Sequence, residues 1–350
     1  MKTQKFSNLP LDEFIDFCLY NKNFGYYMKR NPFGKKGDFI TAPNISRLFS
    51  EMIAIWILSF WKSLGSPKKV NIVELGAGNG MMMKVLIESF QNFPDFFKSC
   101  NFLIHEKSPS LIKIQKKNLN ERKITWISKM DKIKNEPSIF IANEFFDSLA
   151  IKQFRKKKNQ WFEKFVNFEN PKKAFFFEKK INIGKIEQKI NFKISQNQNF
   201  IEYSNLGFKY LRSISKIIKK NTGGLLLIDY GYNGKKMRDT LQAVSNHKFA
   251  NILSNIGKAD ITHNISFSIL KSFLNKIGGL NINLSTQKDF LINMGIKKRA
   301  EIISQKESFL KKADIYYRLK RLIGDNEMGN LFKVMLIRNK KNKFKVGFKN

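Results

Sequence analysis

Val73-Glu74-Leu75-Gly76-Ala77-Gly78-Asn79-Gly80 is the stretch that decides the fold. Before it, Val70 to Val73 is apolar and β-branched, which predicts a buried strand, and after it, Met81 to Phe90 has helical composition and spacing. Glycine at every second position allows turn conformations that a Cβ forbids, and lets a ligand lie against the backbone beside the helix N-terminus. The stretch therefore predicts a strand, a glycine turn and a helix that cradle a ligand.

The spacing of these glycines separates two classes of ligand. A dinucleotide site has Gly-x-Gly-x-x-Gly, whereas here Met81 occupies the third glycine position and Gly80 comes one residue earlier. The pattern Glu-x-Gly-x-Gly-x-Gly resembles motif I of class I S-adenosylmethionine (SAM) methyltransferases. Glu74 would then accept a hydrogen bond from the ammonium group of this cofactor, directly or through water. A glycine turn that binds nothing is the alternative at this point.

Length and composition predict a globular protein in a reducing compartment. With 350 residues, 42% of them hydrophobic, the chain can bury the core of one large domain or two smaller ones. Cys18 and Cys100 are far apart and, with three histidines, show no metal-ligand spacing, so we expect neither a disulfide framework nor a metal site. No run of about 20 uncharged apolar residues predicts a membrane span, and the N-terminus does not resemble a signal peptide.

The net charge of +36 is typical of proteins that bind nucleic acids. The basic residues, however, are mostly lysines spread over the chain, and they accompany an abundance of Asn, Ile and Phe that an AT-rich coding bias would produce. We therefore expect a solvated, lysine-coated surface and no specific nucleic-acid partner. The densest basic run, Arg155 to Asn159, falls where a hairpin tip is expected.

The residues before the glycine stretch predict a helical extension. Pro10 to Tyr20 has the pattern of an amphipathic helix, and Ile45 to Trp61 that of a long apolar helix. Between them, Phe24 to Pro43 is dense in glycine, proline and threonine. This stretch is either a connection whose Thr41 or Asn44 caps the following helix, or a flap over a pocket.

A second strand is expected from Phe102 to Glu106. An acid that ends the second strand of a nucleoside-binding α/β unit can accept hydrogen bonds from both ribose hydroxyls, and this is the role we expect for Glu106. The alternative is a surface acid at a strand end. A helix from Pro109 to Asn118 and a third strand from Ile124 to Ile127 follow, and we expect the turn at Ser128 to Asp131 near the adenine.

The fourth strand, Ser138 to Ala142, ends in Asn143-Glu144-Phe145-Phe146-Asp147. Open α/β sheets bind ligands at the carboxyl ends of their strands. Methyl transfer is an in-line displacement, so catalysis depends on positioning the acceptor, and the fork of donors on a protonated guanidinium matches carboxylates. Glu144 and Asp147 are thus candidates for holding an arginine. In the alternative, Glu144 caps backbone N–H groups and Asp147 starts a helix.

The remainder predicts an insertion and then the rest of the sheet. Lys152 to Tyr203 shows short alternating segments, with turns expected at Asn170-Pro171 and Gly184, which predicts inserted antiparallel strands. We further expect a helix at Lys209 to Lys220, a fifth strand at Leu225 to Gly231 and a substrate-side loop at Tyr232 to Gly257. Asp239 and Asp260 either face the crevice or satisfy the turns of their own loops. From Ile265 we expect alternating helices and loops, then a final strand at Leu331 to Ile337 and a frayed basic tail from Asn339.

Five stretches are similar to the MidA-like family of methyltransferases, which includes a mitochondrial complex I assembly enzyme. They are Gly25 to Pro43, Glu74 to Gly80, Asn143 to Phe154, Asp239 to Ala243, and Met328 to Val334. The resemblance implies a class I fold, SAM as cofactor, and arginine methylation of a complex I subunit or its bacterial counterpart. By motif it assigns Gly76, Gly78, Gly80 and Glu106 to the cofactor site, and places Asp38, Glu144 and Asp147 at or near the reaction crevice. We expect Glu74 and Asn143 to bind the cofactor as well.

Where the chain departs from the family pattern, the cofactor glycines are intact. Ala77 and Asn79 replace Pro and Arg in the glycine loop, and Asn31, Arg238 and Ser266 replace Asp, Gly and an acid elsewhere, so these changes bear on substrate choice. We expect a protein substrate, a possible homodimer, and a location in the bacterial cytoplasm or, in a eukaryote, the mitochondrial matrix. An RNA or small-molecule methyltransferase and a SAM-binding assembly chaperone without turnover remain alternatives.

The expected organisation combines an α/β SAM-methyltransferase sheet with two additions. The expected units are an N-terminal helical extension (1–65), a SAM-binding core (66–150), an inserted β-rich segment (151–205), the rest of the core with substrate-side loops (206–338) and a basic tail (339–350).

Overall fold

The computed structural model describes residues 8–29, 41–120, 124–168, 174–245, 248–254 and 256–349. In this part of the chain a mixed central sheet has the strand order β15-β16-β10-β5-β2-β3-β4, with the short β14 beside β10. Its strands are β2 (Val70–Leu75), β3 (Cys100–His105), β4 (Ile124–Ile127), β5 (Ser138–Asn143), β10 (Gly223–Tyr232), β14 (Ile265–Ser266), β15 (Leu280–Thr286) and β16 (Phe332–Asn339).

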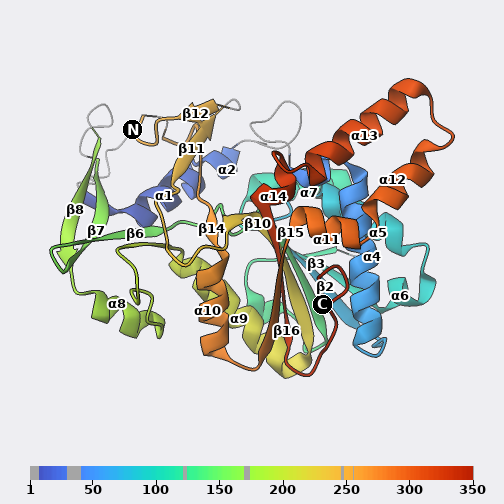
Figure 1. Cartoon of the computed structure of the whole chain (residues 1–350), viewed down its shortest axis with the longest axis horizontal. Helices are drawn as coiled ribbons and strands as arrows, with labels where there is room; N and C mark the ends of the chain where they lie inside the picture. The colour runs from blue at the N-terminus through green and yellow to red at the C-terminus, as the bar shows by residue number, and fades with distance from the viewer. Residues whose placement is uncertain are drawn as a thin grey trace.

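Helices cover both faces of this sheet (Figure 1). They are α1 (Leu11–Tyr20), α2 (Tyr26–Lys29), α3 (Ala42–Ile45), α4 (Arg47–Ser63), α5 (Met81–Phe90), α6 (Pro94–Ser99), α7 (Pro109–Leu119), α8 (Ile183–Ile190), α9 (Asn205–Asn221), α10 (Phe267–Ile277), α11 (Gln287–Asn293), α12 (Ile296–Ser304), α13 (Phe309–Ile323) and α14 (Met328–Leu331), with a 3-10 helix at Met130–Lys132. Each is too short or too polar to span a lipid bilayer, within the ranges described.

The central strands are parallel because the chain crosses over through helices. β4, β3, β2, β5 and β10 pair in parallel, whereas β16 runs antiparallel to both β10 and β15. All six residues of β2 are buried, as expected of a strand covered on both faces. Since side chains alternate along a strand, Ile72 packs with α4 and α5 on one face and Val73 packs with α9 and α10 on the other. The predicted α/β class is confirmed.

The predicted insertion is an antiparallel sheet at one end of the molecule (Figure 1). It contains β6 (Lys152–Lys157), β7 (Gln160–Asn167), β8 (Phe175–Ile181) and β9 (Phe200–Tyr203), and β1 (Asn8–Pro10) from the N-terminus joins its edge. Lys158 and Asn159 both have positive φ at the β6–β7 turn, so the predicted hairpin tip is confirmed. The expected turn at Gly184 is wrong because Asn182 caps α8 there, and Asn170-Pro171 lies outside the described residues.

The segment expected to be a substrate-side loop is partly a small sheet. β11 (Gln242–Ser245) pairs with β12 (Lys248–Ala250) and with β13 (Asp260–Thr262). Further along, the expectation of only helices and loops from Ile265 missed the strand β15. This strand alternates Leu280, Ile282 and Leu284 with polar residues, which is the pattern of a half-buried edge strand.

The expected cap of the long apolar helix is also wrong. The helical run is broken into α3 and α4, and Ser46 lies between them. The Ser46 hydroxyl accepts a hydrogen bond from Leu48 N, so Ser46, and not Thr41 or Asn44, caps α4. Asn44 instead donates to the Thr41 hydroxyl.

The basic tail packs against the core and does not fray over its described part. The Phe344 ring lies edge-on to Trp56 and Phe60 of α4, and Phe348 is buried against Phe290 of α11. The Trp56 indole N–H donates to the carbonyl of Val346 at 3.2 Å. These aromatic anchors outweigh the solvation of the intervening lysines, which remain exposed.

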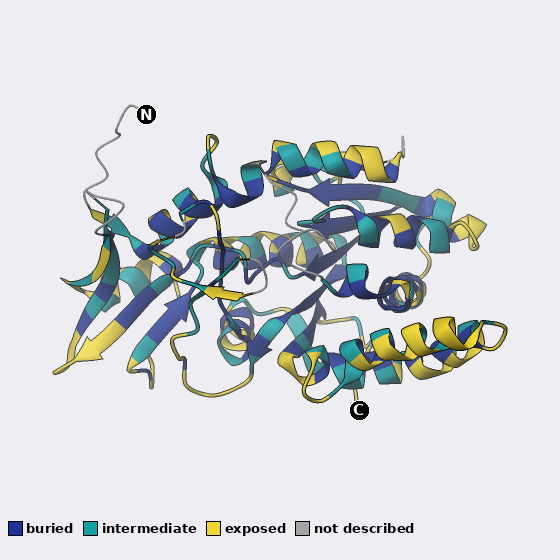
Figure 2. Cartoon of the chain, turned by 90° about the horizontal axis from the view of Figure 1, so that it is seen from above, coloured by how far each residue is buried: buried dark blue, intermediate teal, exposed yellow. Residues whose placement is uncertain are grey.

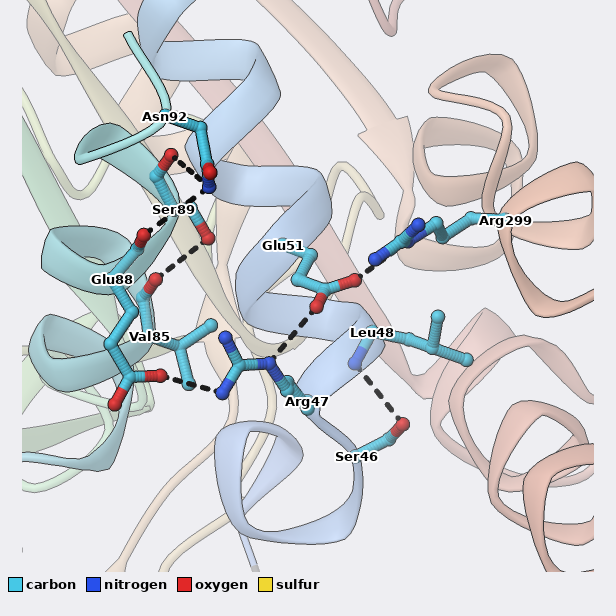
Figure 3. Close-up of polar contacts among 9 residues, drawn as sticks. All are labelled: Ser46, Arg47, Leu48, Glu51, Val85, Glu88, Ser89, Asn92 and Arg299. Atoms are coloured by element: carbon cyan, nitrogen blue, oxygen red, sulfur yellow. Dashed lines mark hydrogen bonds and ion pairs between the residues drawn. The ribbon is translucent and has the colours of Figure 1, made fainter. Parts of the chain in front are cut away.

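Polar contacts join α4 to its neighbouring helices (Figure 3). Arg47 bonds Glu51 within α4 and Glu88 of α5, and Arg299 of α12 bonds the second oxygen of Glu51 at 2.9 Å. The Arg47, Glu88 and Arg299 side chains are 56%, 37% and 41% exposed, so these ion pairs lie at the solvent edge of the helix interface. The strands of the central sheet are buried beneath the helices (Figure 2). The α4 scaffold thereby supports the helix that follows the glycine loop.

Candidate active site

The glycine loop joins β2 to α5 and depends on positive φ. Gly76, Gly78 and Gly80 have φ values of +66°, +54° and +82°. A Cβ on Gly76 would lie 2.8 Å from Cδ2 of Phe145, and one on Gly80 would lie 3.2 Å from Cδ1 of Leu119. Both the backbone conformation and the close approach of neighbouring side chains therefore require glycine at Gly76.

Glu74 and Asn143 present buried, unpaired oxygens beside this loop. Glu74 is only 2% exposed, and its Oε2 has no hydrogen-bond partner in the described ranges; the same is true of Oδ1 of Asn143. Both residues line a small cavity of about 40 Å³ together with Gly76 and Gly78. Burial, and then the charge of Glu106, raise the pKa of Glu74 to about 8. A donor with positive charge would satisfy both oxygens.

Glu106 follows β3 and is held by a network of donors. Its Oε1 accepts hydrogen bonds from the N–H groups of Lys107 and Ser108, both at 2.9 Å, and its Oε2 accepts one from Gln115 Nε2 at 3.0 Å. Burial raises the pKa of Glu106, and these hydrogen bonds oppose the rise. Since each carboxylate oxygen has two acceptor positions, Glu106 retains capacity for one further donor, on Oε2, within the described ranges.

The loop after β5 carries Glu144 and Asp147, as expected from the sequence. Glu144 has a φ of +50°, and its Oε1 accepts hydrogen bonds from Ala42 N at 3.3 Å and Asn143 Nδ2 at 3.1 Å. The N–H groups of Phe146 and Asp147 donate to Oδ2 of the buried Asp229 in β10. Asp229 thus fixes the loop, although sequence analysis did not identify it.

The acids of this loop have raised pKa values. Burial raises the pKa of Glu144 to about 7. Burial also raises the pKa of Asp147, and the neighbouring charges of Asp229, Glu144 and Asp260 add to the rise. Oδ1 of Asp147 has no hydrogen-bond partner in the part of the chain that the structure describes. This loop therefore offers carboxyl groups that gain from a bound cation.

One cavity of about 230 Å³ connects the two halves of the site. Gly76, Gly78 and Glu106 line one part of it, and Glu144 and Asp147 line another. Thr41, at the end of the segment expected to be a flap, also lines the cavity, whereas Asp38 lies outside the described residues.

Other lining residues come from the small third sheet, from flanking helices and from β10. Asp260 of β13 faces the cavity as expected, whereas Asp239 is bonded to Gln153 and Lys164 elsewhere. Sequence analysis did not identify Tyr20, Tyr27, Tyr210 or Tyr230 as lining residues. Tyr27 lies in the glycine-rich stretch shared with the MidA-like family, which was its only sequence signal.

The chain is similar to known methyltransferases in sequence and in fold. The chain is 28% identical to the protein arginine methyltransferase NDUFAF7, mitochondrial, of Xenopus tropicalis, covering 93% of this chain and 81% of the relative. It is 28% identical to the human protein of the same name, over 86% of this chain and 73% of the relative. The fold matches a crystal structure of a Burkholderia thailandensis protein bound to S-adenosyl-homocysteine, with a TM-score of 0.82, 19% identity, and coverage of 97% and 90% of the two chains.

The family model Methyltransf_28, which describes SAM-dependent methyltransferases, matches residues 52–286, the part of the chain that carries the glycine loop, Glu106 and the acids after β5. The fold, the cofactor and the enzyme class expected from the sequence are therefore confirmed. The chain belongs to the Methyltransf_28 family of SAM-dependent methyltransferases.

Proposed function

We propose that this chain methylates an arginine side chain of a protein. One observation carries the proposal: Glu144 and Asp147 line the same cavity as the glycine loop, and neither forms an ion pair with Lys or Arg in the described ranges. Unpaired carboxylates in an enclosed site favour a cationic ligand, and a guanidinium offers the matching fork of donors. The curated relatives are named protein arginine methyltransferases, which supports the same choice.

The residues of the glycine-loop side fit SAM. Gly76 and Gly78 line the cavity without a side chain, so a cofactor can approach their backbone, and the unpaired oxygens of Glu74 and Asn143 would accept from its ammonium group. Glu106 would accept from a ribose hydroxyl with its one remaining acceptor position, on Oε2. When bound, SAM supplies an electrophilic methyl group on a positively charged sulfur.

On the acceptor side, Glu144 and Asp147 would orient the guanidinium so that one nitrogen faces the methyl carbon. That nitrogen forms a bond to carbon as the carbon–sulfur bond breaks, and it loses one proton overall. Glu144 is suited to receive this proton because burial raises its pKa to about 7, close to physiological pH. The product arginine keeps its positive charge, and the proton passes to solvent.

The choice of substrate protein rests on the family resemblance. We propose a respiratory complex I subunit, or its bacterial counterpart, as the protein substrate, with a homodimer as the assembled enzyme. The relatives are mitochondrial proteins, so the mitochondrial matrix, or the cytoplasm of a bacterium, is the proposed location. The residue ranges expected for the extension, core and insertion are the proposed domains.

Transfer of a labelled methyl group tests this function. The full-length chain is incubated with methyl-labelled SAM and fractionated lysate of a strain that lacks it, and labelled species are identified by mass spectrometry. We expect label on an arginine of a protein. Label in RNA or in a small molecule would overturn the substrate class, and no label with SAM bound would indicate a chaperone without turnover.

A further inference from the structure

We infer that Tyr27 and Asp260 form, together with Asp147, a guanidinium-binding subsite that selects a cationic acceptor over a neutral one of the same shape. The inference deepens the proposed function and rests on it. Tyr27 belongs to α2 in the N-terminal extension, and Asp260 opens β13 in the small third sheet. The Tyr27 hydroxyl donates to Oδ1 of Asp260 at 2.9 Å, across 233 residues of sequence.

Both residues belong to the wall of the main cavity. Tyr27 is 8% exposed and Asp260 3% exposed, and both line the 230 Å³ cavity beside Asp147. Asp147 and Asp260 line the same cavity, and the charge of Asp260 adds to the rise in the pKa of Asp147 that burial causes. The chain carries a net charge of +36, yet the described residues that line this cavity include four acids and one lysine, which are Glu106, Glu144, Asp147, Asp260 and Lys107. The excess of acids is therefore specific to the cavity.

Aromatic rings complete the subsite. The rings of Tyr20 and Tyr27 stack with centroids 5.5 Å apart and planes 26° apart, and Tyr230 lines the same cavity. A planar guanidinium binds both to carboxylates, through its N–H groups, and to aromatic faces, through stacking. Lys107 also lines the cavity, but its Nζ lies 4.2 Å from the Tyr20 ring centroid and pairs at 3.0 Å with Asp16, a carboxylate that is not among the lining residues.

The subsite is fixed relative to the cofactor side by Ser108. The Ser108 hydroxyl donates to the carbonyl of Tyr27 at 2.6 Å, and the Ser108 N–H donates to Glu106 at 2.9 Å. One residue therefore holds both the expected ribose acceptor and the tyrosine of the acceptor wall. Through Ser108, the packing of the N-terminal extension against the loop after β3 positions Tyr27 in the acceptor subsite.

Paired ligands that differ in charge test the inference. Nα-acetylarginine amide and its neutral isostere Nα-acetylcitrulline amide are titrated calorimetrically into the full chain saturated with S-adenosyl-homocysteine. We expect the wild-type chain to prefer the arginine probe by at least about tenfold, as for hydrogen bonds to a charged group. Asp260→Asn should reduce the preference to about twofold or less, and Tyr27→Phe, which removes only the hydroxyl that orients Asp260, should give an intermediate value.

The controls separate charge selection from folding. Asp239→Asn removes a carboxylate that pairs with Lys164 outside the cavity and should leave the preference unchanged. Asp260→Glu, which keeps the carboxylate, should prefer the arginine probe more strongly than Asp260→Asn does. SAM affinity should stay within about twofold of the wild type in every variant. Tyr27→Phe and Asp260→Asn chains that keep the wild-type preference, or a wild-type chain that binds the two probes equally, would overturn the subsite. If arginine labelling of protein persists in that case, the proposed function stands without it.

Discussion

The side-chain amide of Gln115 donates to Oε2 of Glu106 at 3.0 Å and also to the carbonyl of Gly78 at 2.9 Å. One buried residue of α7 therefore joins the acid after β3 to the glycine loop after β2. The indole N–H of Trp126 donates to Oε1 of Gln115 and fixes the orientation of the amide. The two cofactor-facing segments are thus held in register by hydrogen bonds that do not depend on a bound ligand.

Gln115→Ala should weaken SAM binding. The substitution removes a donor to a buried carboxylate, and such a bond contributes about 1.5–3 kcal/mol, so we expect a loss of about tenfold to a hundredfold in SAM affinity. Isothermal titration measures it. Gln188→Ala, on the exposed side of α8, is the matched control and should bind SAM normally. Wild-type affinity in Gln115→Ala would show that Glu106 is positioned without this network.

Gly76→Ala should abolish SAM binding while the chain still folds. Its φ of +66° costs an alanine about 1–2 kcal/mol, and the new Cβ would displace the Phe145 ring in the cavity. Gly65→Ala is a close control, because Gly65 has a φ of +83° and nothing lies within 4 Å of its Cβ position. Denaturant unfolding should show a loss from the positive φ in both variants and a larger loss in Gly76→Ala, where the Cβ also meets Phe145, with SAM affinity lost only in Gly76→Ala. Equal SAM affinities in Gly76→Ala and Gly65→Ala would show that SAM does not bind against the glycine loop at Gly76.

SAM binding should release a proton near neutral pH. Glu74 has a pKa raised to about 8 by burial and the charge of Glu106, so it is mostly protonated at pH 7, and a bound ammonium favours its ionised form. Calorimetry at pH 7 in buffers of different ionisation enthalpy should detect release of roughly one proton per SAM. Glu74→Gln should remove the release. If the wild type and Glu74→Gln release the same number of protons per SAM, the released proton comes from a group other than Glu74.

The same raised pKa sets the sign of the pH dependence of stability. An acid whose folded-state pKa lies above its unfolded value of 4.5 binds more protons in the folded state, so its contribution to stability falls as pH rises from about 4.5 to about 8. The ligand-free wild-type chain should therefore lose stability across this window more steeply than Glu74→Gln. Thermal unfolding at a series of pH values compares the two.

Phe348→Ala should destabilise the whole chain. Phe348 is 7% exposed and packs against Phe290, so its truncation leaves a cavity that costs about 3 kcal/mol in the free energy of unfolding. Phe309→Ala, at an 82% exposed position of α13, should change that free energy by about 0.5 kcal/mol or less. Equal effects would indicate that the tail is not anchored.

The elements around the glycine loop were predictable because their local patterns agree with their environment. The strands β2, β3 and β5 are apolar runs that end in or before the candidate site residues, so Glu74, Glu106 and Glu144 could be placed at strand ends. Ile124–Ile127 was predicted with the limits that the structure shows. The same reasoning placed Asp147 beside the cavity.

Other features depend on contacts between distant segments and left no local signal. Asp229 appears in the sequence only as the end of a strand, and its role in fixing the loop after β5 depends on the parallel pairing of β10 with β5. Tyr27 reaches the cavity through packing of α2 against α7 and β13. The tail was expected to fray because lysines dominate it, although Phe344 and Phe348 anchor it.

Glu144→Gln tests the central claim most directly. Glutamine keeps an oxygen that can accept from Ala42 N but cannot take a proton from the acceptor nitrogen. SAM affinity and methyl transfer to the labelled protein are measured on the same preparation. We predict SAM affinity within about twofold of the wild type and a loss of about 10²- to 10⁴-fold in the transfer rate. Transfer at the wild-type rate would contradict the account and leave Glu144 with a structural role alone.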